Sequence, residues 1–254
     1  MIELRGVSKS FDGGATHAVQ GVDLTVEQGA FIAIVGGSGS GKTTTLKMIN
    51  RLLKADAGEI RVEGQPVDAV EPHILRRKIG YVFQEIGLFP HLTVGENIGI
   101  TPKLLGAAKA EIAARVDELL DLVSLPRAFA GRRPAELSGG QRQRVGVARA
   151  LAAKPKLMLM DEPFGALDPV TRDALGREYR ELHERLGLTT LMVTHDITEA
   201  VMLADRIVVM GEGRIRAEGA PSALAVSSDE SVRALMQTPR RQAERVRERL
   251  EPAP

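Results

Sequence analysis

Apolar and polar residues alternate along the first 30 positions of the chain, a pattern typical of strands that bury one face. The apolar positions are Ile2, Leu4, Val7, Val19, Val22, Leu24 and Val26. Residues 31–35, FIAIV, are apolar throughout, which suits a strand buried on both faces. The pattern therefore predicts an antiparallel layer at the start of the chain, followed by the first strand of a buried sheet.

After this run, strands and helices alternate. Apolar residues at helical spacing predict helices over 42–54, 107–123 and 169–187, and another that begins at about Ser138. Short strands are predicted at 59–64, 79–84, 157–160 and 189–195, with a hairpin at 206–219. Asp168 and Asp196 are predicted N-caps, the second in a capping box with Glu199. Strands that alternate with helices imply an α/β fold with a mostly parallel sheet.

Helical patterns dominate residues 95–153, between two sets of strands. We therefore expect this stretch to be an insertion that forms a helical subdomain. Residues 85–106 are rich in Gly and Pro and fit neither the helical nor the strand pattern. Beyond about position 227 the chain is charged and rich in arginine, with helical spacing but few apolar anchors, so we expect a solvated helix there.

The composition narrows the classes of protein that this chain can represent. It has 254 residues, and 34 Lys and Arg stand against 33 Asp and Glu. A net charge of +1 excludes the strongly basic surface of a dedicated nucleic-acid binder. The absence of cysteine excludes disulfides, thiolate metal sites and cysteine nucleophiles. We expect neither a secretory leader nor a membrane span, because the chain has no charged-then-apolar start and no run of about 20 apolar residues.

A glycine-rich segment joins the apolar run at 31–35 to the first predicted helix. It fits the pattern G-x-x-x-x-G-K-[ST], in which backbone N–H groups surround a phosphate. The lysine of this pattern reaches the β- and γ-phosphates, and the hydroxyl that follows can ligate Mg²⁺. The predicted ATP-binding residues are Gly36, Gly37, Ser38, Gly39, Ser40, Gly41, Lys42, Thr43 and Thr44. The alternative is an ordinary glycine-rich turn, which the strand before it and the helix after it disfavour.

Two acids, Asp161 and Glu162, follow the predicted strand at 157–160. An acid at a strand end can hold Mg²⁺, and its neighbour can accept a proton from an attacking water. Two solvated acids before a helix would give the same pattern, but the phosphate loop in the same chain favours the catalytic interpretation.

The segment LSGGQ at 137–141 has two interpretations that share one geometry. Ser138 and Gln141 have the spacing of a capping box, which marks a helix start. The same helix start, with Gly139 and Gly140, exposes N–H groups that form a second anion site. Because the chain has one phosphate loop, this second site needs a second nucleotide or a second chain.

Taken together, these motifs resemble the nucleotide-binding subunit of an ATP-binding cassette (ABC) transporter. GGSGSGKT resembles the Walker A motif, LMLMDE the Walker B motif and LSGGQ the family signature, and the resemblance covers about residues 1–225. Alone, Gln84 could be a polar edge residue and His195 a structural histidine. The resemblance makes Gln84 the Q-loop glutamine, His195 the switch histidine and Asp168 part of the D-loop. Phe11 stands where the family places an aromatic ring against adenine.

The resemblance also implies a fold and a division of the chain. The fold is a P-loop NTPase (RecA-like) α/β core with an antiparallel β layer and an inserted α-helical subdomain. The ATPase domain would be 1–226, and 227–254 would be a charged tail. Within that domain, 1–94 and 154–226 would be the core and β layer, and 95–153 the helical subdomain.

In this family two copies meet head to tail, and each ATP lies between the Walker A motif of one copy and the signature of the other. The resemblance therefore implies a homodimer with ATP and Mg²⁺ as cofactors. The residues that would act in trans are Ser138, Gly139, Gly140, Gln141 and Asp168. Those that would arrange Mg²⁺ are Thr43, Gln84 and Asp161. Glu162 would be the general base or orient the water, with Lys42, Gln84 and His195 at the phosphates.

Longer segments are closer still to the ATPases of osmoprotectant importers: LKMINRLL, RRKIGYVFQEIGLFPHLTVGENI and MDEPFGALDPVTRD. This implies uptake of a quaternary amine such as glycine betaine, carnitine, choline or proline betaine. The expected partners are integral membrane permease subunits and an extracytoplasmic substrate-binding protein, with no nucleic acid. The chain would lie peripherally on the cytoplasmic face of the cell (inner) membrane. The alternatives are a different cargo, a non-transport ATPase, or a binding module with a decayed site.

Two departures from the family pattern stand out. Many members have Pro where this chain has Gly37, and many carry paired cystathionine-β-synthase modules after the ATPase. About 28 residues follow position 226, too few for such a pair, so we expect a cassette without them. The segment 85–96 contains Leu88, Phe89 and Pro90. These residues are either a small satellite core or a groove that receives a short helix from a membrane subunit.

Overall fold

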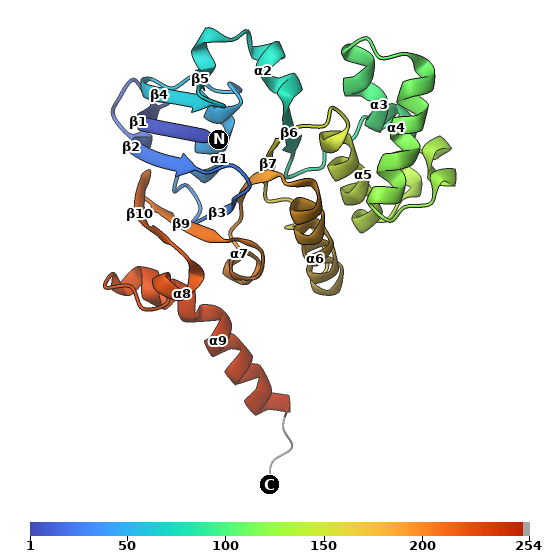
Figure 1. Ribbon diagram of the computed structural model, residues 1–254. Coiled ribbons are helices and arrows are strands. Elements are labelled where there is room, and N and C mark those ends of the chain that lie inside the picture. The colour runs from blue at the N-terminus through green and yellow to red at the C-terminus, as the bar shows by residue number, and fades with distance from the viewer. Residues whose placement is uncertain (251–254) are drawn as a thin grey trace.

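The computed structural model describes residues 1–250, which form two sheets flanked by helices (Figure 1). The first sheet is antiparallel along β1, with the strand order β2-β1-β4-β5. Its strands are β1 (Ile2–Ser10), β2 (His17–Val26), β4 (Ala57–Val62) and β5 (Gln65–Pro66). Ile2 lies opposite Val26 on one side and Val62 on the other, and all three are buried. The predicted antiparallel layer is therefore confirmed.

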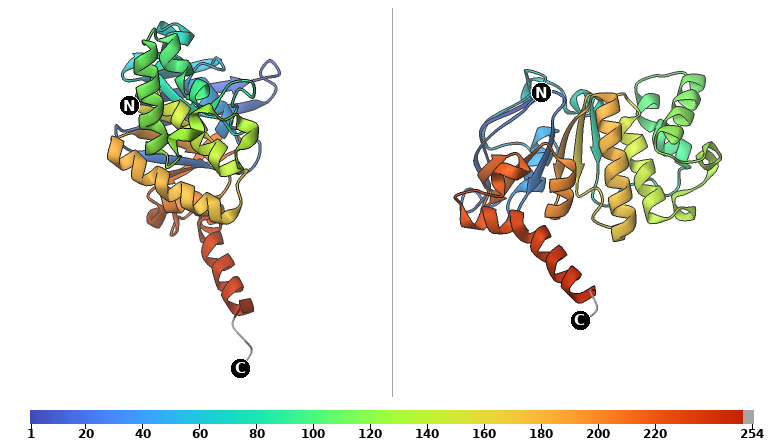
Figure 2. Two further views of the ribbon diagram at one scale, coloured as in Figure 1. Left: turned by 90° about the vertical axis from the view of Figure 1, so that its right-hand side faces the viewer. Right: turned by 60° about the horizontal axis from the view of Figure 1, so that its bottom comes forward.

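The second sheet has the order β10-β9-β3-β8-β7-β6. Its strands are β3 (Phe31–Val35), β6 (Ile79–Val82), β7 (Leu157–Asp161), β8 (Thr189–Val193), β9 (Arg206–Gly211) and β10 (Arg214–Gly219). All neighbouring pairs are parallel except β9 and β10, which form the predicted hairpin. The antiparallel layer lies on one side of this sheet, and the inserted helices lie on the other (Figure 2). The predicted α/β fold is confirmed.

Helix α1 (Lys42–Ile49) packs between the two sheets, and other helices flank the second sheet and fill the insertion between β6 and β7. The other helices are α2 (Pro72–Lys78), α3 (Val94–Leu104), α4 (Lys109–Leu122), α5 (Gly139–Leu151), α6 (Pro169–Leu186), α7 (Ile197–Leu203), α8 (Pro221–Leu224) and α9 (Glu230–Leu250). Short 3₁₀ turns lie at Val67–Ala69, Arg127–Gly131 and Pro134–Glu136. Among the described residues we find no helix with the length and apolar character needed to cross a bilayer.

Strand β3 is apolar at every position because it separates two cores. Ile32 and Ile34 belong to the core between the two sheets, together with Leu46 and Ile49 of α1. Phe31, Ala33 and Val35 belong to the core beneath α3 to α7. Successive side chains of a strand point to opposite faces, so both faces of β3 must be apolar.

The structure corrects several of these expectations. Strands β6 and β8 each end two residues before the predicted ends at 84 and 195, so Gln84 and His195 follow their strands. Helix α1 ends at Ile49, not at position 54, because Asn50 caps it and Arg51 has a φ of 56°. The segment that fitted no pattern contains α3, whose Gly95, Gly99 and Pro102 obscure its periodicity. Asp196 caps α7 as predicted, but the capping box is wrong.

In a capping box the second side chain returns to the backbone of the first. Here the Glu199 carboxylate accepts instead from the Thr194 hydroxyl.

Helix α9 extends away from the body of the molecule (Figure 1 and Figure 2). Its first turns are anchored by Val232 and Met236, which are buried in the same core as α7. The part from position 240 onward is exposed. Residues 251–254 of the expected tail lie outside the described residues.

Candidate functional site

The candidate site residues follow the carboxyl ends of neighbouring parallel strands. β3 leads into Gly36, β6 into Gln84 and β8 into His195, and β7 ends at Asp161. Because these strands run parallel in the order β3-β8-β7-β6, their carboxyl ends meet at one edge of the sheet. Such an edge is where open α/β sheets bind ligands. The topology thus brings together residues that are far apart in the sequence.

Two glycines of the loop between β3 and α1 are required by close backbone contacts. A Cβ atom on Gly36 would lie 2.2 Å from the carbonyl oxygen of Met210. A Cβ atom on Gly41 would lie 2.3 Å from the carbonyl oxygen of Ala18, and Gly41 also has a φ of +99°. Gly37 has no atom within 4 Å of its Cβ position, so this is the place in the loop where a side chain fits.

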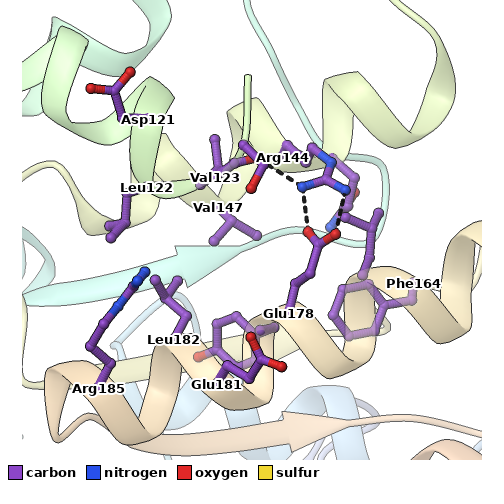
Figure 3. Close-up of a pocket in the computed structure, with 14 residues that line it drawn as sticks. Asp121, Leu122, Val123, Arg144, Val147, Phe164, Glu178, Glu181, Leu182 and Arg185 are labelled. Carbon is purple, nitrogen blue, oxygen red and sulfur yellow. Dashed lines mark hydrogen bonds and ion pairs between the residues drawn. The ribbon is translucent and has the colours of Figure 1, made fainter. Parts of the chain in front are cut away.

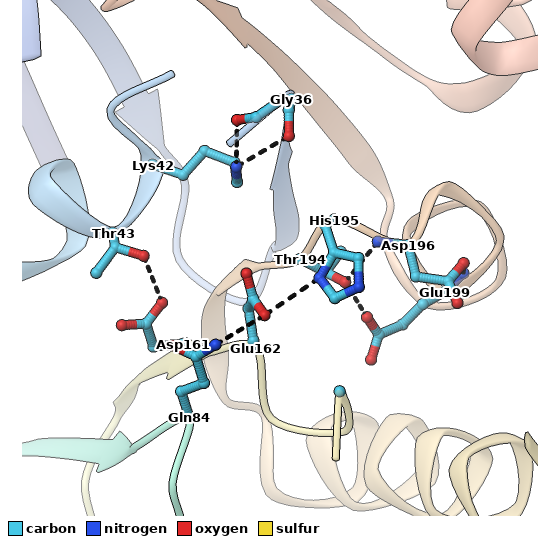
Figure 4. Close-up of polar contacts among 12 residues, drawn as sticks. Gly36, Lys42, Thr43, Gln84, Asp161, Glu162, Thr194, His195, Asp196 and Glu199 are labelled. Carbon is cyan, nitrogen blue, oxygen red and sulfur yellow. Dashed lines mark hydrogen bonds and ion pairs between the residues drawn. The ribbon is translucent and has the colours of Figure 1, made fainter. Parts of the chain in front are cut away.

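Lys42 begins α1 and folds back over the loop. Its Nζ donates to the carbonyl oxygens of Gly36 and Gly37, both at 2.9 Å (Figure 4). The residue is 7% exposed. Burial lowers its pKa, and the nearby carboxylates of Glu162 and Asp161 partly offset this. The ammonium group is therefore held inside the loop that would surround a phosphate.

The next residue, Thr43, contacts the end of β7. Its Oγ1 donates to Asp161 Oδ1 at 2.8 Å (Figure 4). Burial raises the pKa of Asp161, while the hydrogen bond from Thr43 lowers it. A hydroxyl and a carboxylate are donors that Mg²⁺ takes beside nucleotide phosphates. Residues 1–250 hold no cluster of three or more His, Cys, Asp or Glu suited to a metal, so a cation here would need nucleotide ligands as well.

Glu162 is the meeting point of three strand ends. Its Oε2 accepts from Gln84 Nε2 at 3.1 Å and lies 3.1 Å from His195 Nδ1 (Figure 4). Its own N–H donates to the Val193 carbonyl at 2.8 Å. Glu162 has a φ of 46°, a left-handed conformation that is rare for residues other than glycine. Backbone of this kind clusters at functional sites, and here it directs the carboxylate at the ends of β6 and β8.

The phosphate loop and the acid line one open pocket of about 570 Å³. The lining residues are Ala18, Ser38, Gly39, Ser40, Gly41, Lys42, Thr43, Thr44, Glu162 and His195. Three further predicted residues contact this lining: Gly36 through Lys42, Asp161 through Thr43 and Gln84 through Glu162. The structure therefore brings most of the predicted residues to one place. Gln84, expected beside Mg²⁺, donates its amide to Glu162 rather than to Thr43 or Asp161.

The signature residues lie apart from that pocket, at the start of α5. Ser138 caps the helix: its Oγ accepts from the Gln141 N–H at 3.2 Å, and Gln141 Oε1 accepts from the Ser138 N–H at 2.9 Å. The predicted capping box is confirmed. None of Ser138, Gly139, Gly140 and Gln141 lines the pocket described above.

The start of α6 lies against the start of α5. A Cβ atom on Gly140 would lie 2.7 Å from Thr171 Cγ2, so only glycine fits there without a shift. Asp168 caps α6 and accepts from the Thr171 N–H at 3.0 Å. The hydrogen bonds from Thr171 hold the pKa of Asp168 below its usual value. The signature and Asp168 thus form a second patch of helix N-termini, outside the phosphate pocket.

Phe11 is exposed over 66% of its surface. Lys9 Nζ lies 5.7 Å from the centre of its ring. Phe11 does not line the phosphate pocket. Its predicted contact with adenine stays a prediction.

Sequence reasoning missed the buried arginine of α5. Arg149 donates to the carbonyl oxygens of Ile86 at 2.7 Å and Gly87 at 2.6 Å, and burial lowers its pKa. It therefore links the signature helix to the segment just after Gln84. The one signal in the sequence is a charged residue within the otherwise apolar VARAL stretch.

Glu199 was proposed as a capping residue but has a different position. It is 9% exposed, and burial raises its pKa to about 7. The hydroxyl of Thr194, the residue before His195, donates to its carboxylate (Figure 4). The spacing of Asp196 and Glu199 does not distinguish the two arrangements, because the burial of Glu199 depends on the tertiary fold.

A second pocket, of about 340 Å³, lies between α4, α5 and α6 (Figure 3). Its lining includes the apolar side chains of Val123, Val147 and Leu182. Arg144 of α5 forms an ion pair with Glu178 of α6 across it, with Nη2 to Oε1 at 2.8 Å. None of the predicted site residues lines this pocket.

Comparison with known proteins gives a consistent result. The sequence pattern of the family described as ABC transporter matches residues 19–165. The choline transport ATP-binding protein OpuBA of Bacillus subtilis is 52% identical over 221 residues, which are 87% of this chain and 58% of that protein. The glycine betaine uptake system ATP-binding protein YehX of Escherichia coli is 52% identical, over 87% of this chain and 71% of that protein. The chain spans a little more than half the length of the first of these relatives.

A solved structure supports the same comparison. The ATP-binding cassette MJ0796, solved as a dimer in a post-hydrolysis state bound to ADP and Pi, superposes with a TM-score of 0.78. It is 35% identical to this chain, and the match covers 87% of this chain and 98% of that one.

Proposed function

Since this chain belongs to the ABC transporter family, we propose that it is the ATP-hydrolysing subunit of an importer for an osmoprotectant such as glycine betaine, choline or carnitine. The observation that carries the proposal is the position of Glu162. Its carboxylate is held by Gln84 and His195 at the rim of a phosphate-binding loop. An acid fixed beside a phosphate site, with a polar group on each side, is arranged to orient a water for attack.

The charged and polar residues at this site then have distinct roles. Lys42 and the N–H groups of the loop neutralise the phosphates, so Nζ exchanges the carbonyls of Gly36 and Gly37 for phosphate oxygens. Thr43, Asp161 and Gln84 would hold Mg²⁺. The metal, when bound, offsets the negative charge of the phosphates. Glu162 takes a proton from the attacking water or orients it, and His195 fixes the water against the γ-phosphate.

The second patch is completed by a second copy of the chain. Ser138, Gly139, Gly140 and Gln141 form a partly exposed helix N-terminus that favours anions, yet they lie outside the pocket of their own chain. A head-to-tail dimer brings this patch of one copy over the phosphate loop of the other. Asp168 then lies at the contact between copies, and Phe11 contacts the adenine.

The membrane partner meets the segment 85–96. Leu88 packs against the core, whereas Phe89 is 42% exposed and Phe83 is 43% exposed. Asn97 is fully buried and hydrogen-bonds both the N–H and the carbonyl of Phe89, which fixes the backbone at this position. The exposed ring of Phe89 would offer an apolar contact to a helix of a permease subunit. A substrate-binding protein would join the complex outside the cell, and the chain would lie on the cytoplasmic face of the inner membrane.

We further divide the chain into an ATPase domain, 1–226, and a tail, 227–254. Within the domain, the core and β layer are 1–94 and 154–226, and the helical subdomain is 95–153. Arg149 and the Arg144–Glu178 pair link α5 to its neighbours. These contacts allow the helical subdomain to move when the position of Gln84 changes.

Phosphate release from Mg-ATP tests the enzymatic part of this proposal. The purified chain is expected to release phosphate, and Lys42→Ala to lower the rate at least ~100-fold. Lys54→Ala is the matched control, because this lysine follows α1 and does not line the pocket. Equal rates for the wild type and Lys42→Ala would contradict the proposal.

A further inference from the structure

One arginine joins the two loops that flank the catalytic acid. Arg172, in the first turn of α6, donates from Nη2 to the carbonyl oxygens of Leu167 at 3.0 Å and Gly165 at 3.3 Å. Its Nη1 donates to Asp196 Oδ2 at 3.0 Å. Arg172 thus ties the turn at 165–168, which ends in Asp168, to the switch segment at 194–196, which contains His195.

The switch segment is held at both ends. Asp196 uses Oδ2 for Arg172 and Oδ1 for the N–H groups of Thr198 and Glu199, at 2.9 and 3.2 Å. The Asp196 N–H donates to Thr194 Oγ1 at 3.1 Å. Because His195 lies between Thr194 and Asp196, a shift of Arg172 moves the backbone that carries the histidine.

The guanidinium suits this task better than an ammonium group would. It reaches acceptors on two segments at once, because its two Nη groups are fixed in one plane. The side chains of Arg172 and Asp196 are each 28% exposed, so the pair is partly screened from water. Removing the arginine leaves the turn and the switch segment without their direct link.

We propose that Arg172 is a positioning residue that couples the two ATP sites of the dimer, by transmitting movement of the 165–168 turn to His195. The inference rests on the proposed function, in which Asp168 contacts the second copy. When the second copy closes against Asp168, the movement of the 165–168 turn sets the position of His195 in this chain. Hydrolysis at the two ATP sites then becomes cooperative. Arg172 does not touch the reacting atoms and acts through Asp196.

Hydrogen exchange without nucleotide tests the link itself. Arg172→Met is expected to raise amide exchange at least ~10-fold in both 165–168 and 194–197. Arg177→Met is the matched control, because Arg177 lies on the same helix in an exposed ion pair with Asp173. Asp196→Asn, which keeps the Oδ1 cap, tests the link from the opposite end and should also raise exchange in both segments. Exchange that rises in one segment alone, or in neither, overturns the link.

The ATP dependence of hydrolysis tests the coupling. The wild type is expected to show a Hill coefficient approaching about 2, and Arg172→Met a coefficient near about 1. Arg172→Lys should restore part of the difference, and Arg177→Met should match the wild type. If Arg172→Met raises exchange in both segments but keeps the Hill coefficient of the wild type, the coupling role is overturned. A wild type that releases no phosphate overturns the proposed function instead, while the exchange result still decides the link.

Discussion

Glu162 Oε2 lies 3.1 Å from His195 Nδ1, so the acid that follows β7 and the histidine that follows β8 form one unit. Gln84 donates to the same oxygen at 3.1 Å. One carboxylate oxygen therefore contacts residues that follow two other strands, β6 and β8.

Changing Glu162→Gln should separate binding from hydrolysis. The amide cannot accept the proton of the attacking water, so the rate is expected to fall ~10²–10⁴-fold. ATP binding should persist because the phosphate loop is unchanged, and the variant should accumulate as an ATP-bound dimer. Phosphate release and size-exclusion chromatography in Mg-ATP measure both effects. Glu181→Gln, an exposed acid on α6, is the control. A Glu162→Gln protein that stays monomeric in saturating Mg-ATP would count against the account.

Two glycines of the same loop should differ in their tolerance of alanine. Gly41→Ala places a Cβ 2.3 Å from the Ala18 carbonyl oxygen, at a φ of +99°. The strain is expected to cost about 1–3 kcal/mol and to abolish nucleotide binding. Gly37→Ala meets no atom within 4 Å and should bind ATP within about twofold of the wild type. Calorimetric titration with an ATP analogue compares the two, and equal affinities would exclude the observed loop geometry.

The buried carboxyl group of Glu199 should make the stability of the protein depend on pH. Burial raises the pKa of Glu199 from 4.5 to about 7, so the folded state retains a proton that the unfolded state has lost. The contribution of Glu199 to the free energy of unfolding is fully present below pH 4.5 and is lost as the pH rises through about 7. The difference between these pKa values corresponds to at most about 3 kcal/mol.

Glu199→Gln removes this titration and keeps an oxygen that can accept from Thr194. Between pH 5 and 8, the wild type is expected to lose about 1–3 kcal/mol of unfolding free energy relative to the variant. Urea unfolding at several pH values measures the difference. Parallel curves for the two proteins would refute the assignment.

The exposed ring of Phe89 should matter for assembly and not for folding. Phe89→Glu puts a charge on the surface proposed to meet the permease, and co-purification with the membrane subunits is expected to fall at least ~10-fold. Phosphate release by the isolated chain should not change, because Phe89 does not line the phosphate pocket. Val226→Glu is the control, since this residue is 79% exposed elsewhere on the surface. If Phe89→Glu alters neither assembly nor hydrolysis, the segment is a local core and not a docking surface.

The parts of the fold that were predictable are those with strong local patterns. The run FIAIV predicts β3 because both of its faces are buried, and Asp168 before Pro169 predicts the start of α6. Helix α3 escaped prediction because its pattern is interrupted. A Cβ atom on Gly99 would lie 2.7 Å from Ile112 Cγ2, so this glycine is required by the contact with α4 and not by a turn.

The residues of the candidate site also fall into those with a local sequence pattern and those without one. The loop at 36–44, the acids at 161 and 162 and the start of α5 have local signatures, and Gln84 and His195 gained meaning only from the set. Arg172 and Arg149 have no such signature. Their partners are backbone carbonyls and, for Arg172, also the Asp196 carboxylate, and the tertiary fold brings these groups together. Contacts of this kind follow from the tertiary fold and not from residue spacing.

Uptake of labelled glycine betaine and choline at high osmolarity tests the central claim most directly. The strain would lack the gene for this chain and be complemented with the wild type or with Lys42→Ala. The account predicts that uptake is lost without the gene and restored by the wild type alone, because transport needs ATP bound at the phosphate loop. Uptake that persists without the gene, or that Lys42→Ala restores fully, would contradict it.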